Sequence, residues 1–521
     1  MSDSQETISA HDEVPLVPRN TRYGYSSKST YAQVSAVLIQ SWLFIDLGLQ
    51  MTMPTLVLGA LHRNPNAAPL DLDDDQASWF GSIPDLSLPL ASLSSGLFQD
   101  TFGRKGSMML VTIPLCSGWL LLYSARSITT LYAVAVIWGL VGGLCEAPLM
   151  CYMGEIGEPH LRGTLSSIST LATLAGSFMM YTLGYFFDWR TAALVCSAFP
   201  AITFVIVTQM PESPSWLIAR NRLDDAKKAL CWLRGWVEPH EVEEEFQDIV
   251  NYTRMSTGVG TILDDSDQSI EGNSLGKKDG YLKTQYKEMT DKKILRPLRL
   301  IFALFSICGV ASVAGNRPYL IGELTELGVP INPKLVLIGA LVFFTLGAMG
   351  NVMFLRRFGK RNIALVSHFF GALCIFGIGA YCSYAKVFTP VPELRWLPVI
   401  LWFTLQFLAG LSIILLPWQL VSEVFPLTGR GLASGIAGAW AHLSSSILVK
   451  SYLYTESLIS LSGIMYLYGC GTVVGLIYLY LYLPETEGKS LEQIETYFTD
   501  QHDRKEKFSI GRPSSFSHAS P

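Results

Sequence analysis

Residues 96–105 read Gly-Leu-Phe-Gln-Asp-Thr-Phe-Gly-Arg-Lys and lie between two long apolar runs. The stretch combines one acid, two adjacent cations and two glycines. Glycine permits a tight turn, and charged side chains are tolerated where a helix meets the membrane surface. We therefore expect a charged hinge between two membrane helices, whose contacts can be broken and remade as the helices move.

The composition of the chain is that of a membrane protein. Of the 521 residues, 50% are hydrophobic and 16% are charged, and the mean hydropathy is +0.32. A soluble chain of this length is rarely so apolar. The net charge of −5 gives no reason to expect a nucleic acid as a partner.

The sequence gives no sign of enzymatic chemistry. The nine cysteines show neither a Cys-x-x-Cys spacing nor an interleaved histidine pattern, so disulfides and metal sites are not expected. The chain has no Gly-rich phosphate loop, and the three aspartates at 73–75 lack the spacing of a calcium site. We expect no catalytic residue, no metal and no cofactor.

Twelve apolar runs are long enough to cross a bilayer core of about 30 Å, which needs roughly 20 helical residues. They fall at about 32–60, 77–98, 107–124, 128–153, 164–186, 190–209, 298–322, 335–355, 361–384, 396–421, 432–455 and 460–483. A polar stretch divides them six and six, so we expect an all-α membrane protein with two six-helix halves. The expected organisation is an N-terminal tail (1–31), an N-terminal half (32–210), a central loop with short helices (211–297), a C-terminal half (298–483) and a C-terminal tail (484–521).

Basic residues give the orientation of these runs. Clusters at 104–105, 220–228 and 356–361, with single cations at Arg162, Arg430 and Lys489, all fall on one side of the bundle. Because cytoplasmic loops carry the excess of Lys and Arg, we expect both tails and the central loop to be cytosolic. The first 30 residues lack a signal-peptide core, so the first span is expected to be retained.

Within the central loop, residues 223–235 have apolar side chains at helical spacing, early acids and a terminal glycine. This pattern predicts an amphipathic helix that packs against the cytosolic face of the bundle. A helix that lies on lipid or binds calmodulin is the alternative.

Motifs along the whole length resemble one family, the sugar porters of the major facilitator superfamily, and within it the insect facilitated trehalose transporter-like proteins. The resemblance rests on residues 78–82 (SWFGS), the 96–105 hinge, Glu155 with Arg162-Gly163, residues 211–217 (PESPSWL), residues 423–426 (EVFP) with Arg430-Gly431, and residues 484–489 (PETEGK). It implies a monomeric carrier of a small solute that is surrounded by membrane lipid and resides in the plasma membrane. Such carriers alternate between states in which a central site faces one side or the other.

The resemblance also implies an inner latch of ion pairs that holds the outward-open state. Its members would be Asp100, Arg104, Lys105, Glu155, Arg162, Glu423 and Arg430. Anchoring of the bundle by positive charge alone would explain the cations but leaves the paired acids without a role. The second copy of the hinge departs from the family pattern, because Arg356 stands where an acid is usual.

The expected substrate site has lost the amides with which sugar porters bind hydroxyls. By alignment of the flanking motifs, the amide positions hold Thr170, Cys308, Gly309, Ala314, Phe344, Ala441 and His442. Aromatic side chains remain at Tyr319 and Trp418. Each unpaired sugar hydroxyl would cost roughly 1–3 kcal/mol, so a simple hexose is not expected as the substrate. The substrate-binding candidates are Trp418, Tyr319, Thr170, Cys308, Phe344 and His442.

Several ionisable residues fall at membrane depth, where burial of a charge is costly and usually functional. At 1.5 Å per residue, Glu146 lies about 13–14 Å from the cytosolic end, His442 about 16 Å, Asp46 about 21 Å and Asp85 about 22 Å. Arg317, at about 30 Å, falls at the outer interface, where snorkelling explains it.

Glu146, Asp46 and Asp85 are therefore the candidates for proton or charge coupling. Each also has a structural alternative: Asp46 or Asp85 could pair with a backbone amide, with Ser82 or Ser87, or with a lysine. By alignment, Asp46 also stands two residues before the acid of the proton-coupled sugar porters.

Three functions remain open at this point. The chain could be a sugar or trehalose uniporter that holds its ligand with Trp418 and Tyr319. It could be a proton-linked carrier of a non-sugar solute that uses Glu146 and Asp46. It could also be a sensor that does not transport and signals through the central loop and tail.

Overall fold

A computed structural model of the chain describes residues 27–64, 70–158, 161–257, 292–384, 391, 393–425, 430–489 and 491–499. The central-loop residues 258–291 and the C-terminal tail beyond residue 499 lie outside this range. The structure therefore leaves the sensor hypothesis, which depends on these segments, unaddressed.

The N-terminal half is built from long helices. They are α1 (Ser27–Leu61), α2 (Asp74–Phe102), α3 (Arg104–Ser124), α4 (Ile128–Ile156), α5 (Arg162–Phe186), and the consecutive pair α6 (Trp189–Cys196) and α7 (Ala198–Val207). The pair α6 and α7 fills the place of the sixth expected span.

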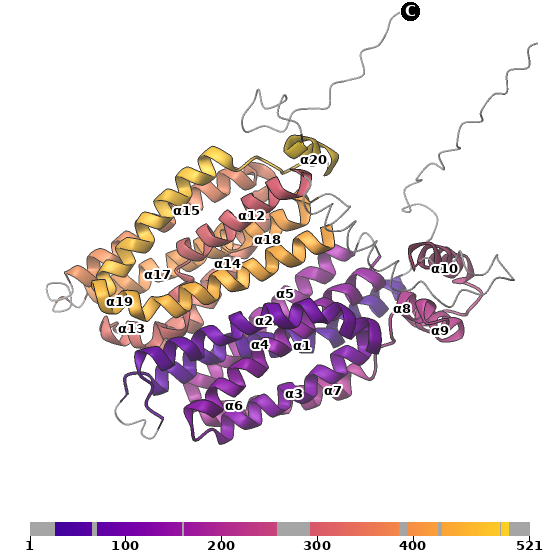
Figure 1. Cartoon of the computed structure of the whole chain (residues 1–521), viewed down its shortest axis with the longest axis horizontal. Helices are drawn as coiled ribbons and strands as arrows, with labels where there is room; N and C mark the ends of the chain where they lie inside the picture. Colours follow the sequence, from indigo (N-terminus) through magenta and orange to yellow (C-terminus); the bar gives the residue numbers. More distant parts are fainter. Residues whose placement is uncertain are drawn as a thin grey trace, which may run out of the picture.

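The C-terminal half follows the same plan. Its single helices are α14 (Pro333–Phe358), α15 (Lys360–Ser383) and the long α19 (Arg430–Tyr482). The first span consists of α12 (Lys292–Ala311), η4 (Ala314–Tyr319) and α13 (Leu320–Glu326). The span between α15 and α19 consists of η5 (Leu394–Trp396), α17 (Leu397–Leu408), η6 (Ala409–Ile413) and α18 (Leu415–Val424). Figure 1 shows the two halves, indigo to magenta and red to yellow, packed side by side.

Among the described residues, nine helical segments are long and apolar enough to cross a membrane. The expected spans in α2 and α5 fall outside this set; α2 carries Asp85 and a series of serines. The long α19 contains two spans, because Ser460 interrupts it with a φ of 66° and a ψ of 168°. When α2, α5 and the second span of α19 are added to the nine segments, the helices correspond to the twelve spans expected from the sequence.

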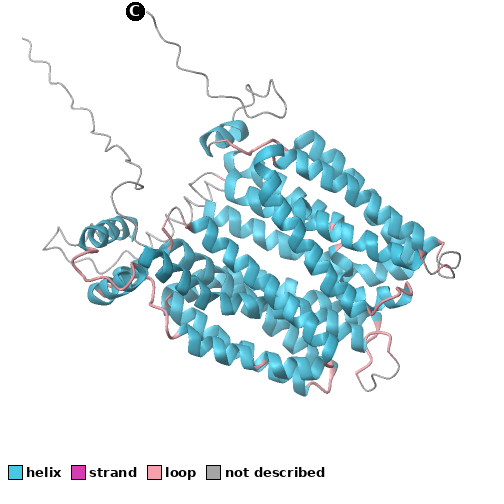
Figure 2. Ribbon diagram, turned by 180° about the vertical axis from the view of Figure 1, so that it is seen from behind, coloured by secondary structure: helices cyan, strands magenta, loops and turns pink. Residues whose placement is uncertain are grey.

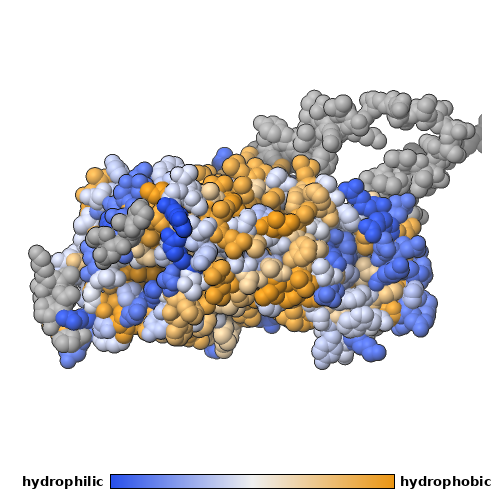
Figure 3. All heavy atoms as spheres, turned by 90° about the horizontal axis from the view of Figure 1, so that it is seen from below, coloured by the Kyte–Doolittle hydropathy of each residue, from blue (hydrophilic) through white to orange (hydrophobic). Residues whose placement is uncertain are grey.

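The surface is consistent with a membrane environment. Figure 3 shows a broad band of hydrophobic side chains between more polar ends. Leu93, Phe186 and Val352 are among the large apolar side chains exposed on the surface. In water such an area would favour association, whereas in lipid it is the expected outer face.

Short helices cover one end of the bundle (Figures 1 and 2). They are α8 (Pro214–Ala219), α9 (Leu223–Leu233) and α10 (Glu243–Thr257), and α20 (Leu491–Thr499) follows the last span. The amphipathic helix predicted at 223–235 is confirmed as α9. Its buried Ala226 and Leu230 pack with α8 and α10, and α9 also contacts α1. We call the opposite end of the bundle the outer end.

Candidate functional site

The predicted hinge is a single residue between two helices. α2 ends at Phe102, α3 begins at Arg104, and Gly103 between them has a φ of 83°. A Cβ atom at this position would lie 2.3 Å from Oε2 of Glu212. The hinge therefore needs glycine both for its backbone conformation and for the close approach of a carboxylate.

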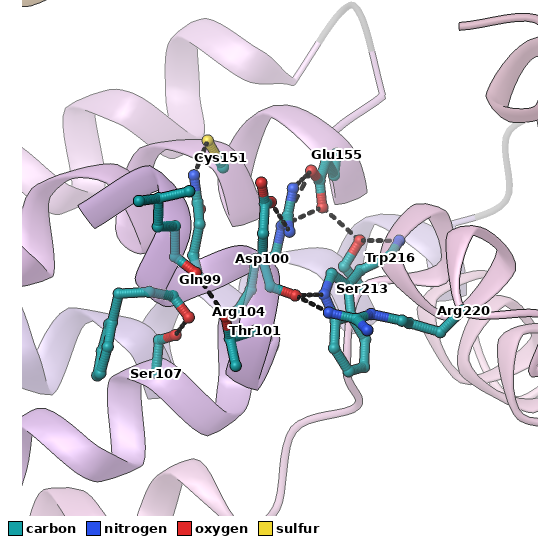
Figure 4. A network of polar contacts seen from close by, with 12 residues as sticks. Gln99, Asp100, Thr101, Arg104, Ser107, Cys151, Glu155, Ser213, Trp216 and Arg220 are labelled. Carbon is teal, nitrogen blue, oxygen red and sulfur yellow. Dashed lines mark hydrogen bonds and ion pairs between the residues drawn. The ribbon is translucent and has the colours of Figure 1, made fainter. Parts of the chain in front are cut away.

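Asp100 and Arg104 of this hinge lie close to Glu155 of α4 (Figure 4). Nη2 of Arg104 donates to Oε1 of Glu155 at 2.7 Å, and Nη1 lies 3.5 Å from Oδ1 of Asp100. The hydroxyl of Ser213 also donates to Glu155. Charge-assisted bonds of this kind are stronger than neutral ones. We call Asp100, Arg104, Glu155 and Ser213 the N-half cluster.

A further acid, which the sequence did not single out, caps the start of α3. Glu212 accepts hydrogen bonds from the backbone N–H groups of Arg104 at 3.0 Å and Lys105 at 3.1 Å. The positive end of a helix dipole favours a carboxylate at this position. The Lys105 ammonium donates to the carbonyl of Thr208 at 2.8 Å, so its observed contact is with the end of the sixth span rather than with the acids of the cluster.

Helix α8 is tied to the same hinge. The indole Nε1 of Trp216 and Nη2 of Arg220 both donate to the backbone carbonyl of Asp100, at 3.0 Å and 2.6 Å. The 211–217 motif was visible in the sequence, but its partner was not, because the two segments are more than 100 positions apart.

The C-terminal half repeats this arrangement at Gly359, whose φ is 77°. Glu485 accepts from the backbone N–H groups of Lys360 and Arg361, both at 3.0 Å. The Lys360 ammonium pairs with Glu423 and lies 3.2 Å from Oε2 of Glu487. The acid expected at the position of Arg356 is thus replaced by acids from the segment after α19.

Each charged cluster joins elements of one half rather than bridging the two. The N-half cluster connects α2, α3, α4 and α8, and Lys360 connects α15 with α18 and residues 484–489. The expected latch members Arg162 and Arg430 have side chains outside those that the structure describes. The described contacts would therefore hold the helix ends together within each half.

Ion pairs and hydrogen bonds between the halves occur at the outer end. Asp85 on α2 accepts from Ser445 on α19 at 2.6 Å and lies 3.6 Å from Nδ1 of His442. Arg317 on η4 lies 3.8 Å from the same carboxylate. Of the partners expected for Asp85, a hydroxyl is present, but it belongs to Ser445 of the other half rather than to Ser82 or Ser87. Arg317, which we expected at the outer interface, keeps 46% of its side chain exposed and makes this contact in addition.

Other contacts between the two halves also close the outer end. The Lys450 ammonium lies 2.6 Å from Asp75, and Ser446 donates to the carbonyl of Ser82 at 3.0 Å. Arg63 lies 3.3 Å from Glu456 on α19. These bonds join α19 to α2 and to the chain after α1, so the structure represents a conformation that is closed at the outer end.

A histidine lies beside this closure. Nε2 of His62, directly after α1, lies 2.8 Å from Oδ1 of Asp74. Burial lowers the pKa of His62, so the ring is neutral at neutral pH. The contact with Asp74 is then a hydrogen bond, and the charge on Asp74 is balanced by Arg63 at 3.1 Å.

Two of the coupling candidates occupy different environments. Asp46 is fully buried between α1 and α7, where Oδ2 accepts from the Thr203 hydroxyl at 3.2 Å and Oδ1 has no partner. It thus lies inside the N-terminal half, away from the contact between the halves. Glu146 on α4 is half-buried and makes no hydrogen bond or ion pair with any residue that the structure describes.

The substrate-binding candidates lie on several helices of both halves. Trp418 keeps 42% of its surface exposed and packs edge-on against Phe305, with ring centroids 4.9 Å apart. Thr170 is exposed and its hydroxyl donates to Ser166 on its own helix. Phe344 is half-buried on α14.

Two of these candidates are buried in this conformation, with 4% of the surface of each exposed. Tyr319 is buried, and its hydroxyl donates to the carbonyl of Val449 at 3.1 Å. Cys308 is buried with its sulfur 3.9 Å from Nε2 of His368. The residue type at an aligned position suggested a binding role, but the rotation of each helix directs the side chain into the protein.

The described helices do contain amides, but these are used internally. Asn351 donates to the carbonyl of Leu411 at 2.6 Å and accepts from Gln419 at 2.9 Å. Asn316 donates to the Glu323 carboxylate at 2.9 Å. Within the described residues, no group of three or more His, Cys, Asp or Glu side chains could hold a metal ion, and the nine cysteines are free thiols.

Comparisons with known proteins agree with this architecture. A model of the family described as sugar (and other) transporter matches residues 21–498. Facilitated trehalose transporter Tret1 of Anopheles gambiae is 25% identical over 96% of this chain and 62% of its own length. Tret1 of Apis mellifera ligustica is 25% identical over 89% of this chain and 88% of its own. The chain thus spans less than two thirds of the mosquito relative.

Solved structures share the fold at low sequence identity. The inward-open xylose transporter XylE from E. coli is 18% identical and superposes with a TM-score of 0.65 over 90% of this chain and 99% of that one. The peptide transporter POT in complex with alafosfalin gives a TM-score of 0.58 at 14% identity, over 88% and 98% of the two chains. The predicted fold of two six-helix halves is confirmed, and the family match over most of the sequence leads to one conclusion: the chain belongs to the sugar (and other) transporter family.

Proposed function

We propose that this transporter carries a sugar across the plasma membrane by alternating access, as a monomeric unit with both tails in the cytosol. The observation that carries the proposal is the pair of charged hinges, one per half, at the end opposite the outer closure. The two halves can then rock as units about the central contact, with the outer bonds broken in one state and made in the other.

Trehalose, named for the relatives, is the first candidate solute. A disaccharide offers two rings to aromatic surfaces, and Trp418 presents an exposed indole on α18. A single hexose would depend more on hydroxyl recognition, for which the aligned positions hold Thr170, Phe344 and Ala441 instead of amides. This favours a larger sugar over glucose.

Uptake into vesicles containing the purified protein tests this proposal. Labelled trehalose should enter saturably, and glucose should enter at least about tenfold more slowly, because one lost hydrogen bond of about 1.4 kcal/mol corresponds to a factor of ten. A hexose porter in the same vesicles serves as the positive control for glucose. Equal uptake of both sugars would contradict the recognition argument, and no saturable uptake of trehalose would contradict the choice of solute.

Proton-linked transport of a non-sugar solute is the second candidate, and the half-buried, unpaired Glu146 favours it. A carboxylate without a partner can bind a proton in one state and release it in the other. Uptake should then increase as the external pH falls and collapse with a protonophore. Glu146→Gln should keep the exchange of solute across the membrane but lose accumulation of the solute against a gradient. Glu146→Asp should keep part of this accumulation. Uptake that is independent of pH in the wild type would exclude this candidate.

A further inference from the structure

A surface groove of about 560 Å³ lies where the end of the N-terminal half meets α8 and α9. Its apolar lining includes Phe102, Met109 and Trp232, and its charged rim includes Lys105, Arg222 and Lys228. Figure 1 shows α8 and α9 beyond the end of the bundle at which α3 begins. The groove therefore lies at the membrane boundary on the side that we expect to be cytosolic.

The free charge of this groove is positive. Its two acids are already occupied: Glu212 accepts the backbone N–H groups at the start of α3, and Asp225 pairs with Arg222 at 2.7 Å. Lys105 makes its hydrogen bond to the neutral carbonyl of Thr208. Lys228 is exposed and makes no hydrogen bond or ion pair with the residues that the structure describes. With three cations and two acids in its lining, the groove carries a net charge of +1, and Lys228 has no paired acid among the described residues, which favours an anionic occupant.

The apolar lining continues into the surface that faces lipid. Met109 lies one helical turn before Ile113, and Gln209 at the edge of the groove follows Val205 by one turn. Ile113 is 60% exposed and Val205 is 61% exposed, on the neighbouring helices α3 and α7. An occupant with acyl chains could place them along α3 and α7 while its head group stays in the groove.

We propose that this groove binds the head group of an anionic phospholipid of the inner leaflet. The phosphodiester accepts hydrogen bonds from the ammonium groups of Lys105 and Lys228, and Trp232 in the lining adds an indole ring, a group that favours the membrane interface. The groove shares Glu212 and Trp216 with the charged hinge. A bound lipid therefore holds α8 and α9 against α3 and stabilises the N-half cluster.

Native mass spectrometry of the full-length protein tests this site directly. The probes are palmitoyl-oleoyl-phosphatidylglycerol, the zwitterionic phosphatidylcholine with the same chains, and soluble glycerol 3-phosphate. The variants are Lys228→Gln and Arg222→Gln/Lys228→Gln. The matched control is Lys227→Gln, which removes the same charge from the neighbouring position of α9, where the ammonium pairs with Glu243 outside the groove.

The wild type should bind phosphatidylglycerol more tightly than phosphatidylcholine. Lys228→Gln should weaken this binding about fivefold and the double variant further, since each basic residue near a charged surface contributes about 1 kcal/mol. Lys227→Gln should bind like the wild type. Equal binding of the two lipids, equal effects of Lys227→Gln and Lys228→Gln, or competition by glycerol 3-phosphate at similar concentration would overturn the proposal. Because binding is measured without a transported solute, these outcomes are independent of the solute proposed above.

Discussion

Gly96 and Gly103 are seven positions apart in the same hinge, yet a side chain would meet different surroundings at each. At Gly103 the φ is 83° and a Cβ atom would lie 2.3 Å from the Glu212 carboxylate. At Gly96, inside α2, no atom lies within 4 Å of the added Cβ. The two glycines look equivalent in the sequence, and only the second is required by the fold.

Gly103→Ala should therefore lower the stability of the protein by about 1–3 kcal/mol, because an alanine is strained at this φ and displaces Glu212. Gly96→Ala should be neutral or slightly stabilising, since alanine is the better helix former by roughly 1 kcal/mol. Thermal unfolding of both variants in one detergent measures the difference. Equal melting temperatures would show that the turn tolerates a side chain.

The Arg104 side chain is the centre of the N-half cluster, with 13% of its surface exposed. Arg104→Ala should leave Glu155 without its charged partner and cost about 2 kcal/mol, within the range for hydrogen bonds to charged groups. Transport should fall severalfold at unchanged expression. Lys227→Ala, which breaks an exposed pair with Glu243, should change little. Equal transport rates in Arg104→Ala and Lys227→Ala would contradict a functional role for the N-half cluster.

Among the elements, α2 and α19 form the outer closure. Asp85 on α2 contacts η4 as well as α19, so one carboxylate connects the N-terminal half to two elements of the C-terminal half. The contacts of Lys450 and Ser446 lie on the same pair of helices. A single substitution in α2 or α19 should therefore shift the equilibrium between the states in which the outer end is closed and open.

Asp85→Asn should open the outer end more often, because it removes the charge that attracts Arg317 and His442. Ser446→Cys, introduced as a reporter, is shielded in the closed state, since Ser446 is 4% exposed. Its reaction with a thiol reagent added from outside should be about tenfold faster in the Asp85→Asn background, which corresponds to about 1.4 kcal/mol. Ser444→Ala, which removes a bond within α19 only, should leave the rate unchanged. An unchanged rate with Asp85→Asn would show that other contacts hold the closure.

At the scale of the whole molecule, local sequence patterns predicted the helices and the first hinge. Apolar runs gave the spans, and the 96–105 pattern indicated the contact between Asp100 and Arg104, which lie four positions apart on either side of Gly103. The contact of Asp85 with Ser445 was not predictable, because the residues are 360 positions apart and a single sequence does not give the rotation of α2 relative to α19. The same reason explains why the burial of Tyr319 and Cys308 was not predictable.

Alternating access requires the outer closure to open in every cycle, and a reversible cross-link across it tests this most directly. In Asp75→Cys/Lys450→Cys the two thiols would replace side chains of α2 and α19 whose charged groups now lie 2.6 Å apart across the closure. A short bifunctional thiol reagent should abolish trehalose uptake into vesicles, and a reductant should restore it, while each single cysteine variant keeps its uptake. Uptake that continues after the cross-link has formed would contradict the account.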